Sequence, residues 1–257
     1  MTSKQDVSRQ FGRTAKAYAT SAGHASGSDL AIVLQLLNPQ TYMRVLDVAT
    51  GAGHTAAAVA PLVAEVVASD LVPEMIGETQ LLFSKRGLQN VSAVVSDVEL
   101  LLFPDHSFDA VTCRIAPHHF LDIEKALREI ARVLKPGGVF VVEDSCAPEA
   151  VRQDRFINEL ETLRDPTHIR SYTKKQWKQM LVRAGMRVAR LRNYRKTHEV
   201  ADWIQRSDLG ADQQAKVWAA FANAPAWARK RFSITYEAAQ AKTYSDDKVI
   251  IRAVKEA

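Results

Sequence analysis

Three short apolar runs within residues 1–100 each end in an aspartate, and this repetition constrains the fold more than any other feature. The runs end at Asp47, Asp70 and Asp97, and helical patterns follow the first two, over His54 to Leu62 and Pro73 to Arg86. Strands that alternate with helices predict a parallel sheet, whose strands share the carboxyl edge at which open α/β sheets bind ligands. We therefore predict an α/β fold with three carboxylates at its ligand-binding edge.

The segment Asp47 to Gly53 has the composition of a nucleotide-binding turn. Gly51 and Gly53 allow the backbone to turn sharply and to approach a ligand closely, and the next helix would offer free N–H groups to a ligand carboxylate. The acid suits a ligand that carries an ammonium group. Asp70, 23 positions after Asp47, could accept ribose hydroxyls. Alone, the motif is ambiguous, because a strand, a glycine turn and a helix also close ordinary βα units.

Four segments taken together are more specific than any one of them. They are Val45 to Gly53, Val66 to Asp70, Ser96 to Asp109, and Arg132 to Gly138. With these segments the chain resembles the class I S-adenosylmethionine-dependent methyltransferases over nearly its whole length. It looks closest to the group of ubiquinone and menaquinone C-methyltransferases and related small-molecule methyltransferases. Quinone specificity does not follow, because Tyr18-Ala19-Thr20-Ser21 replaces the Tyr-Asp-x-Met-Asn pattern of the quinone enzymes.

The resemblance implies S-adenosylmethionine as cofactor and a small molecule as methyl acceptor. It also implies a place for each cofactor-binding residue. The methionine end would lie at Asp47 and the turn of Gly51 and Gly53, and the ribose at Asp70 and Leu71. Adenine would lie at Asp97 and Val98. Tyr18 would close over the cofactor, and Arg114 would border it. Two alternatives stay open, since Asp97 could simply begin an Asx turn and Tyr18 could simply pack within a lid helix.

The same resemblance implies a Rossmann-like, doubly wound sheet of seven strands, mostly parallel, with an antiparallel final strand. N-terminal lid helices and helical insertions in the C-terminal half would surround it. We expect one methyltransferase domain over residues 1–257, because 47% hydrophobic residues suffice for one sizeable core. Its parts are a helical lid (1–40), a cofactor-binding core (41–145), a substrate-side part with a strand at 186–194 (146–245), and the final strand (246–257).

Periodicity and capping signals predict the remaining elements. Glycine and proline break the late helical segment at Gly210 and Pro225. The expected strands are Phe108 to Arg114, Val139 to Glu143, Met186 to Tyr194 and Val249 to Val254, and the expected helices are Asp6 to Tyr18, Ser28 to Leu37, Ile123 to Leu134, Pro148 to Leu163, Thr173 to Ala184 and patches of Glu199 to Phe232.

Three histidines are candidates for catalysis. Methyl transfer depends mainly on positioning, but an oxygen or carbon acid must also lose a proton, for which histidine is suited near neutral pH. His118 and His119 follow the fourth predicted strand, in a loop that lies near the reacting methyl group in the family. His168 follows the helical insertion, where similar enzymes cover the acceptor. Alternatively, the first two only shape the pocket, and the third lies in a surface loop before the cap Thr173.

Charge is divided unevenly along the chain. Residues 1–145 carry 12 Lys and Arg against 16 Asp and Glu, whereas residues 146–257 carry 22 against 13. A basic patch could bind phosphate or carboxylate, but the alternation of a strand splits these side chains between two faces, which favours a solvated surface. The residues concerned are Arg183, Arg187, Arg190, Arg192, Arg195 and Lys196.

Several other classes of protein are less consistent with the sequence. An NAD-dependent oxidoreductase would normally have a third glycine where Ala56 or its neighbours stand. A nucleic-acid methyltransferase would use the basic half, but we find no nucleic-acid-binding module and no Asn/Asp-Pro-Pro-Tyr motif. A noncatalytic S-adenosylmethionine-binding module remains open. The spacing of Cys113 and Cys146 indicates neither a disulfide framework nor a metal site.

No apolar stretch reaches the roughly 18 residues of a membrane span, and the polar start of the chain does not predict a signal peptide. We therefore expect no membrane partner and a cytoplasmic location. The acceptor atom and the oligomeric state are not predictable from these residues.

Overall fold

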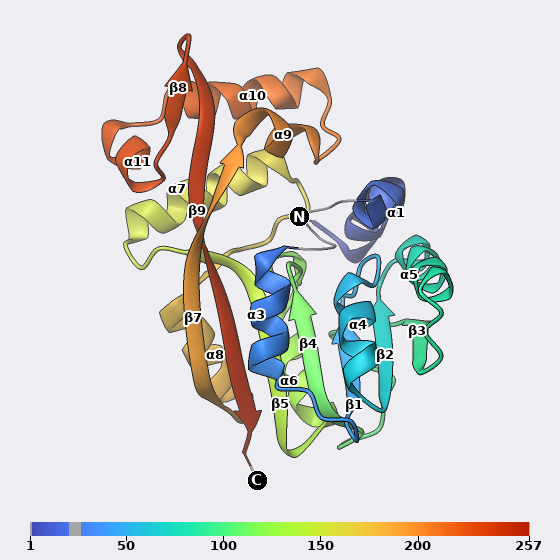
Figure 1. Cartoon of the computed structure of the whole chain (residues 1–257). Coiled ribbons are helices and arrows are strands. Elements are labelled where there is room, and N and C mark those ends of the chain that lie inside the picture. Colours follow the sequence, from blue (N-terminus) through green and yellow to red (C-terminus); the bar gives the residue numbers. More distant parts are fainter. Residues whose placement is uncertain (1, 21–26, 257) are drawn as a thin grey trace.

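A twisted sheet with helices on both faces forms the centre of the computed structural model, which describes residues 2–20 and 27–256 except the side chains of 17, 18 and 20 (Figure 1). Its main path has the strand order β3-β2-β1-β4-β5-β9-β7. These strands are β1 (Arg44–Val48), β2 (Glu65–Asp70), β3 (Val91–Val95), β4 (Phe108–Arg114), β5 (Leu134–Ala147), β7 (Met186–Glu199) and β9 (Gln240–Lys255).

The direction of the strands confirms the predicted fold class. Strands β1 to β5 on the main path are parallel to one another, and β9 runs antiparallel to both of its neighbours, β5 and β7. Two short strands join the predicted seven in the described sheet: β6 (Tyr172–Thr173) pairs with β5, and β8 (Thr235–Glu237) pairs with β9.

Two apolar clusters lie on opposite faces of the sheet. Helices α6 (Ile123–Val133) and α8 (Lys174–Arg183) cover one face, and α3 (Ser28–Leu37) and α4 (His54–Val59) cover the other. Strands β1, β2 and β4 are almost continuously buried, because helices cover both faces of the sheet. Helix α5 (Pro73–Lys85) begins with proline, and α4 passes into a 3-10 turn, η1 (Ala60–Leu62), at Pro61.

A third apolar cluster lies beyond the carboxyl edge of the sheet. It joins α7 (Val151–Arg164), α9 (Val200–Gln205), α10 (Ala211–Ala222) and α11 (Ala226–Arg231) around the outer part of β9. Gly210 and Pro225 stand at the N-caps of α10 and α11, as the predicted breaks require. Trp203 and Phe221 pack against Tyr244 in this cluster, which forms the upper part of Figure 1.

Three of the predicted strands are too short. The strand expected at residues 139–143 spans Leu134–Ala147. The strand expected at residues 186–194 continues to Glu199, and the strand expected at 249–254 begins at Gln240. The outer parts of β7 and β9 pair with each other, with His198 opposite Tyr244. Their polar sequences do not alternate clearly, so this pairing and the burial of Tyr244 determine the strand there. Across the described residues, no helix is both long and apolar enough to cross a membrane.

Candidate active site

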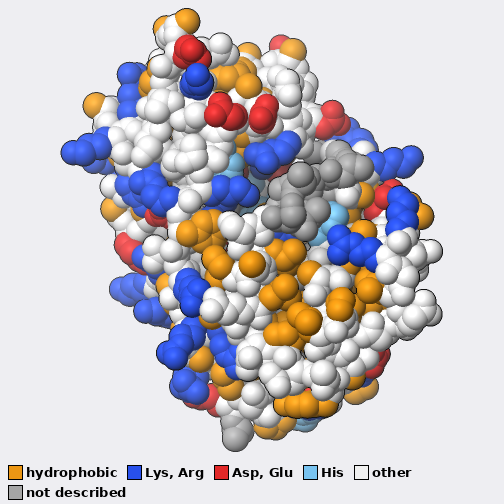
Figure 2. Space-filling model, in the orientation of Figure 1, with side chains coloured by type: hydrophobic (Ala, Val, Ile, Leu, Met, Phe, Trp, Pro, Cys, Tyr) orange, Lys and Arg blue, Asp and Glu red, His pale blue; other side chains and the backbone are white. Residues whose placement is uncertain are grey.

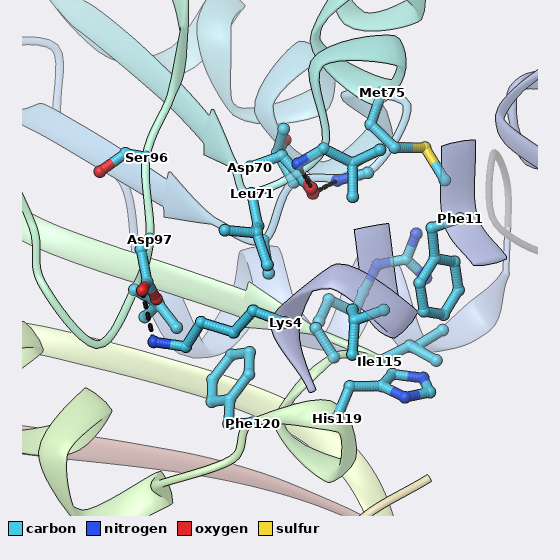
Figure 3. Close-up of a pocket in the computed structure, with 18 of the residues that line it drawn as sticks. Lys4, Phe11, Asp70, Leu71, Met75, Ser96, Asp97, Ile115, His119 and Phe120 are labelled. Atoms are coloured by element: carbon cyan, nitrogen blue, oxygen red, sulfur yellow. Dashed lines mark hydrogen bonds and ion pairs between the residues drawn. The ribbon is translucent and has the colours of Figure 1, made fainter. Parts of the chain in front are cut away.

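A cavity lies at the carboxyl edge of the sheet, where the glycine turn, β2, β3 and β4 end (Figure 3). The helix α1 (Lys4–Thr20) lies over this cavity, which we call the first cavity, and contributes Val7 and Phe11 to its wall. Many residues predicted to bind the cofactor line the first cavity together: Gly51, Asp70, Leu71, Asp97, Val98 and Arg114. The side chain of Tyr18, on α1, lies outside the described part of the structure.

Asp70 presents a fixed carboxylate to the first cavity. Its Oδ1 accepts a hydrogen bond from the backbone N–H of Val72 at 2.9 Å, and its Oδ2 accepts one from the N–H of Gly51 at 2.8 Å. Burial raises the pKa of this carboxyl above its ordinary value. Because each carboxylate oxygen has two lone pairs, both can still accept a hydroxyl donor from a ligand.

The two glycines of the turn have different roles. Gly51 has a φ of +57°, and no heavy atom lies within 4 Å of the position that a Cβ would take. Its backbone is therefore open toward the first cavity. Gly53, with a φ of +82°, does not line the cavity; a Cβ there would come within 2.8 Å of Thr79 Cγ2. Gly53 is thus required for the close approach of α4 to α5.

Asp47 lies beneath the turn and outside the wall of the first cavity. It is buried, and its oxygens accept hydrogen bonds from the hydroxyls of Thr50 (2.5 Å) and Thr112 (2.6 Å). Burial raises its pKa to about 6. The structure thus places Asp47 beneath the turn, where it binds the hydroxyls of Thr50 and Thr112, and its contact with the cofactor stays a prediction.

Asp97 connects the first cavity to the lid helix. Its Oδ1 accepts the N–H of Glu99 at 2.9 Å, so the Asx turn considered for this residue is present. Its Oδ2 pairs with Lys4 Nζ at 2.5 Å, and Lys4 also pairs with Glu99 at 2.7 Å. Figure 3 shows Lys4 reaching across the cavity to Asp97. Lys4 and Glu99 gave no recognisable signal in the sequence, because their contact joins positions distant along the chain.

Arg114 secures the opposite wall of the first cavity. It is buried at the end of β4, forms an ion pair with Asp29 at 2.5 Å, and donates a hydrogen bond to Thr55 Oγ1 at 3.0 Å. These contacts fix α3 and α4 to the sheet at the cavity.

A second cavity adjoins the first and shares three lining residues with it, Phe11, Ile115 and His119. These three lie side by side in Figure 3, and the rings of Phe11 and His119 are in edge contact with centroids 4.8 Å apart. The second cavity has a volume of about 460 Å³, within the size range of small-molecule sites. Its other walls come from β5, β7, β9, α7 and α9.

His118 lines the second cavity and is paired with a buried carboxylate. Its Nδ1 lies 2.5 Å from Asp144 Oδ1, so Nδ1 is the protonated nitrogen of the neutral ring and Nε2 can accept a proton. Although burial lowers the pKa of His118, the charge and hydrogen bond of Asp144 raise it above the ordinary value. This is the geometry of an oriented general base.

The other two candidate histidines have different surroundings. His119 Nδ1 lies 3.1 Å from the Thr167 carbonyl oxygen, and burial with the neighbouring His118 lowers its pKa to about 4. His168 lines neither cavity; its Nε2 contacts Asn158 Oδ1 at 3.1 Å, and burial lowers its pKa to about 2. The ring of His168 packs beside that of His118, with centroids 5.5 Å apart, and its contact with the acceptor stays a prediction.

The basic side chains of the second half do not form one patch. Arg187, Arg190 and Arg192 line a surface groove beside α3, on the side of the molecule where Figure 2 shows many basic groups. Arg183 pairs with Glu124, and Lys196 faces the second cavity. Three of the six basic residues thus share one groove, and Arg183 and Lys196 lie apart from it.

Glu143 and Asp144 near the end of β5 are the main functional candidates that the sequence analysis missed. The rule that led to Asp47, Asp70 and Asp97, an acid near the carboxyl end of a parallel strand, applies to them as well. Within the described ranges no cluster of His, Cys, Asp and Glu could hold a metal ion.

Comparison with known proteins agrees with this architecture. Residues 46–142 match the methyltransferase domain family. The uncharacterized methyltransferase YcgJ of Bacillus subtilis is 36% identical over 225 residues, which cover 88% of this chain and 89% of that protein. The chain belongs to the class I S-adenosylmethionine-dependent methyltransferases. S-adenosylmethionine is the methyl donor that this family implies.

Solved structures support the relationship along most of the methyltransferase chain. The crystal structure of YcgJ aligns with a TM-score of 0.86 and 34% identity over 89% of this chain and 98% of that one. The crystal structure of a putative methyltransferase from Bacillus halodurans aligns with a TM-score of 0.87 and 35% identity over 90% of this chain and 100% of that one. The ubiquinone/menaquinone C-methyltransferase UbiE of Shewanella oneidensis is 40% identical over 113 residues, only 42% of this chain and 44% of that protein.

Proposed function

We propose that this methyltransferase binds S-adenosylmethionine in the first cavity and methylates a small molecule held in the second. The observation that carries the proposal is the junction of the two cavities at Phe11, Ile115 and His119. An acceptor in the second cavity could meet the cofactor there, and holding two reactants in line can supply most of the rate enhancement. The partial likeness to UbiE does not carry a quinone acceptor to this chain.

The residues of the first cavity fit the cofactor. The fixed carboxylate of Asp70 would accept the ribose hydroxyls, with Leu71 beside it, and the open backbone at Gly51 would contact the methionine end. Asp97 and Val98 would border the adenine. When bound, S-adenosylmethionine supplies an electrophilic methyl group for in-line displacement.

His118 would accept the acceptor's proton. Asp144 orients its ring through Nδ1 and stabilises the imidazolium that forms, which leaves Nε2 as the proton-accepting atom. His119, which remains neutral, would border the reacting groups at the junction of the cavities.

A screen of metabolites for cofactor-dependent formation of S-adenosylhomocysteine tests the proposal. We expect turnover of at least one small acceptor, and a loss of roughly 10²-fold or more in kcat for His118→Ala with an oxygen or carbon acid acceptor. His106→Asn is the matched control, because His106 is exposed and lines neither cavity. Folded enzyme that binds the cofactor but methylates only nucleic acid would refute the proposal. A normal rate in His118→Ala would show that His118 is not the general base.

A further inference from the structure

Several charged side chains of the second cavity already have partners. Lys248 Nζ donates to Ser145 Oγ at 2.7 Å and pairs with Asp246 at 2.8 Å, and Asp246 also contacts His198 at 3.1 Å. Arg164 lies 3.9 Å from Glu161 and donates to a backbone carbonyl. These groups are satisfied within the protein.

Glu143, by contrast, has an unsatisfied oxygen. The side chain lines the second cavity and is only 1% exposed. Oε1 accepts a hydrogen bond from the Tyr194 hydroxyl at 2.9 Å, but Oε2 has no hydrogen-bond partner among the described residues. Burial raises the pKa of Glu143 to about 7. A buried acceptor without a donor is destabilising, so its persistence at a cavity wall indicates a ligand that supplies the donor.

Lys196 is a cationic group in the same cavity as Glu143. It lies on β7, is half-buried and lines the same cavity. Among the residues that the structure describes, none forms a hydrogen bond or ion pair with its Nζ. Burial and the nearby Lys248 lower its pKa, while the charges of Asp29 and Glu143 raise it. Lys196 therefore faces the cavity with no ion-pair partner in the described part of the chain, although the charges of Asp29 and Glu143 act on it.

The two residues come from different strands of the sheet. Glu143 lies near the junction with the first cavity, because its backbone carbonyl accepts the N–H of Ile115, one of the shared residues, at 2.9 Å. Lys196 lies two strands farther along the sheet, past β9. Trp203 and Phe11 provide apolar surface between these elements.

We infer that the second cavity selects a dipolar acceptor, with a hydroxyl or amine that donates to Glu143 and a carboxylate or phosphate that pairs with Lys196. This inference rests on the proposed function, since it concerns the class of molecule that the acceptor cavity takes.

Calorimetric titrations of the protein saturated with S-adenosylhomocysteine test the inference. The probes are two matched series: 4-hydroxybenzoate, benzoate and phenol, and 4-aminobutyrate, butyrate and butylamine. In at least one series, we expect the two-pole probe to bind about tenfold more tightly than either single-pole relative, the effect of one charge-assisted hydrogen bond.

Variants assign each pole to its residue. In Lys196→Met, the two-pole probe should bind no more tightly than the donor-only probe. In Glu143→Leu, it should bind no more tightly than the anion-only probe. Glu143→Gln keeps an acceptor oxygen and should retain part of the hydroxyl preference. Lys242→Met is the matched control, because Lys242 forms an exposed ion pair with Glu237 away from both cavities. Unchanged affinity for S-adenosylhomocysteine shows that each variant is folded.

The outcomes separate the inference from the proposed function. If S-adenosylhomocysteine binds but no two-pole probe binds preferentially, or if the preferences survive both Lys196→Met and Glu143→Leu, the inference is wrong and the proposed function stands. If S-adenosylhomocysteine itself does not bind to folded protein, the proposed function fails first.

Discussion

At the scale of single residues, His118 and His119 are neighbours whose surroundings push their pKa values in opposite directions. Their ring centroids lie 4.1 Å apart. Asp144 raises the pKa of His118, whereas burial and the adjacent His118 lower that of His119 to about 4. Pairs of titratable groups separated in this way often divide acid and base roles at an active site. Here the separation favours His118 as the proton acceptor.

The pH dependence of catalysis should report this arrangement. His118 accepts a proton only in its neutral form, so kcat/KM should fall as the pH drops through its raised pKa. In Asp144→Asn the pKa of His118 should decrease, which moves the acid limb of the pH profile to lower pH. The loss of the oriented ring should also reduce kcat/KM by roughly 10- to 100-fold. Pre-steady-state and steady-state rates between pH 5 and pH 9 measure both effects. An acid limb that stays at the same pH in Asp144→Asn would contradict the role of this pair.

Gly53 should be less tolerant of substitution than a glycine of similar conformation in open space. Gly53→Ala combines a left-handed backbone with a contact of 2.8 Å to Thr79, and should lower the free energy of unfolding by about 2–4 kcal/mol. Gly137→Ala, with a φ of +75° but no atom within 4 Å, should cost only about 1–2 kcal/mol. Urea denaturation compares the two, and equal losses would show that the contact with α5 is unimportant.

At the scale of elements, α1 is held over the first cavity by ion pairs at its beginning. Lys4 is the first residue of this helix and pairs with Asp97 and Glu99. The Lys4 side chain is 36% exposed, so each pair contributes up to about 1 kcal/mol and is weakened by salt.

Removal of these ion pairs should loosen the lid. Lys4→Met should accelerate dissociation of S-adenosylmethionine about two- to fivefold at low ionic strength and by less at high salt, measured by stopped-flow fluorescence. Arg9→Met, which removes an exposed charge from the same helix, is the control. Equal rates for Lys4→Met and the unaltered protein would mean that α1 does not retain the cofactor.

The elements also differ in how well the sequence predicts them. Strands β1 and β2 end within one residue of Asp47 and Asp70, as predicted, because buried parallel strands have apolar sequences bounded by polar residues. The edge strand β3 is only partly buried and ends at Val95, two residues before Asp97. The outer parts of β7 and β9 have no such signature. Lys196, His198 and Asp246 are polar because they form or border the second cavity, and their strands are fixed by partners distant in the sequence.

At the scale of the whole molecule, the first cavity was largely predictable and the second was not. The first is assembled from consecutive βα units, so the residues that build it follow a local rule along the chain. The second collects side chains from α7, α9, β5, β7 and β9, which meet only in the folded protein. Of its lining residues, His118 and His119 were predicted because they follow β4, and Lys196 was named only as a member of a basic patch. Glu143 and Lys248 required the tertiary structure.

Titration of the purified, folded protein with S-adenosylmethionine by calorimetry is the most direct test of the assigned cofactor site. We expect one site per chain, a loss of affinity of at least about tenfold in Asp70→Ala, and no change in Asp105→Ala, whose carboxylate is exposed and pairs with Arg132 outside both cavities. Absence of binding to the folded protein, or undiminished affinity in Asp70→Ala, would contradict the assignment of the first cavity as the cofactor site.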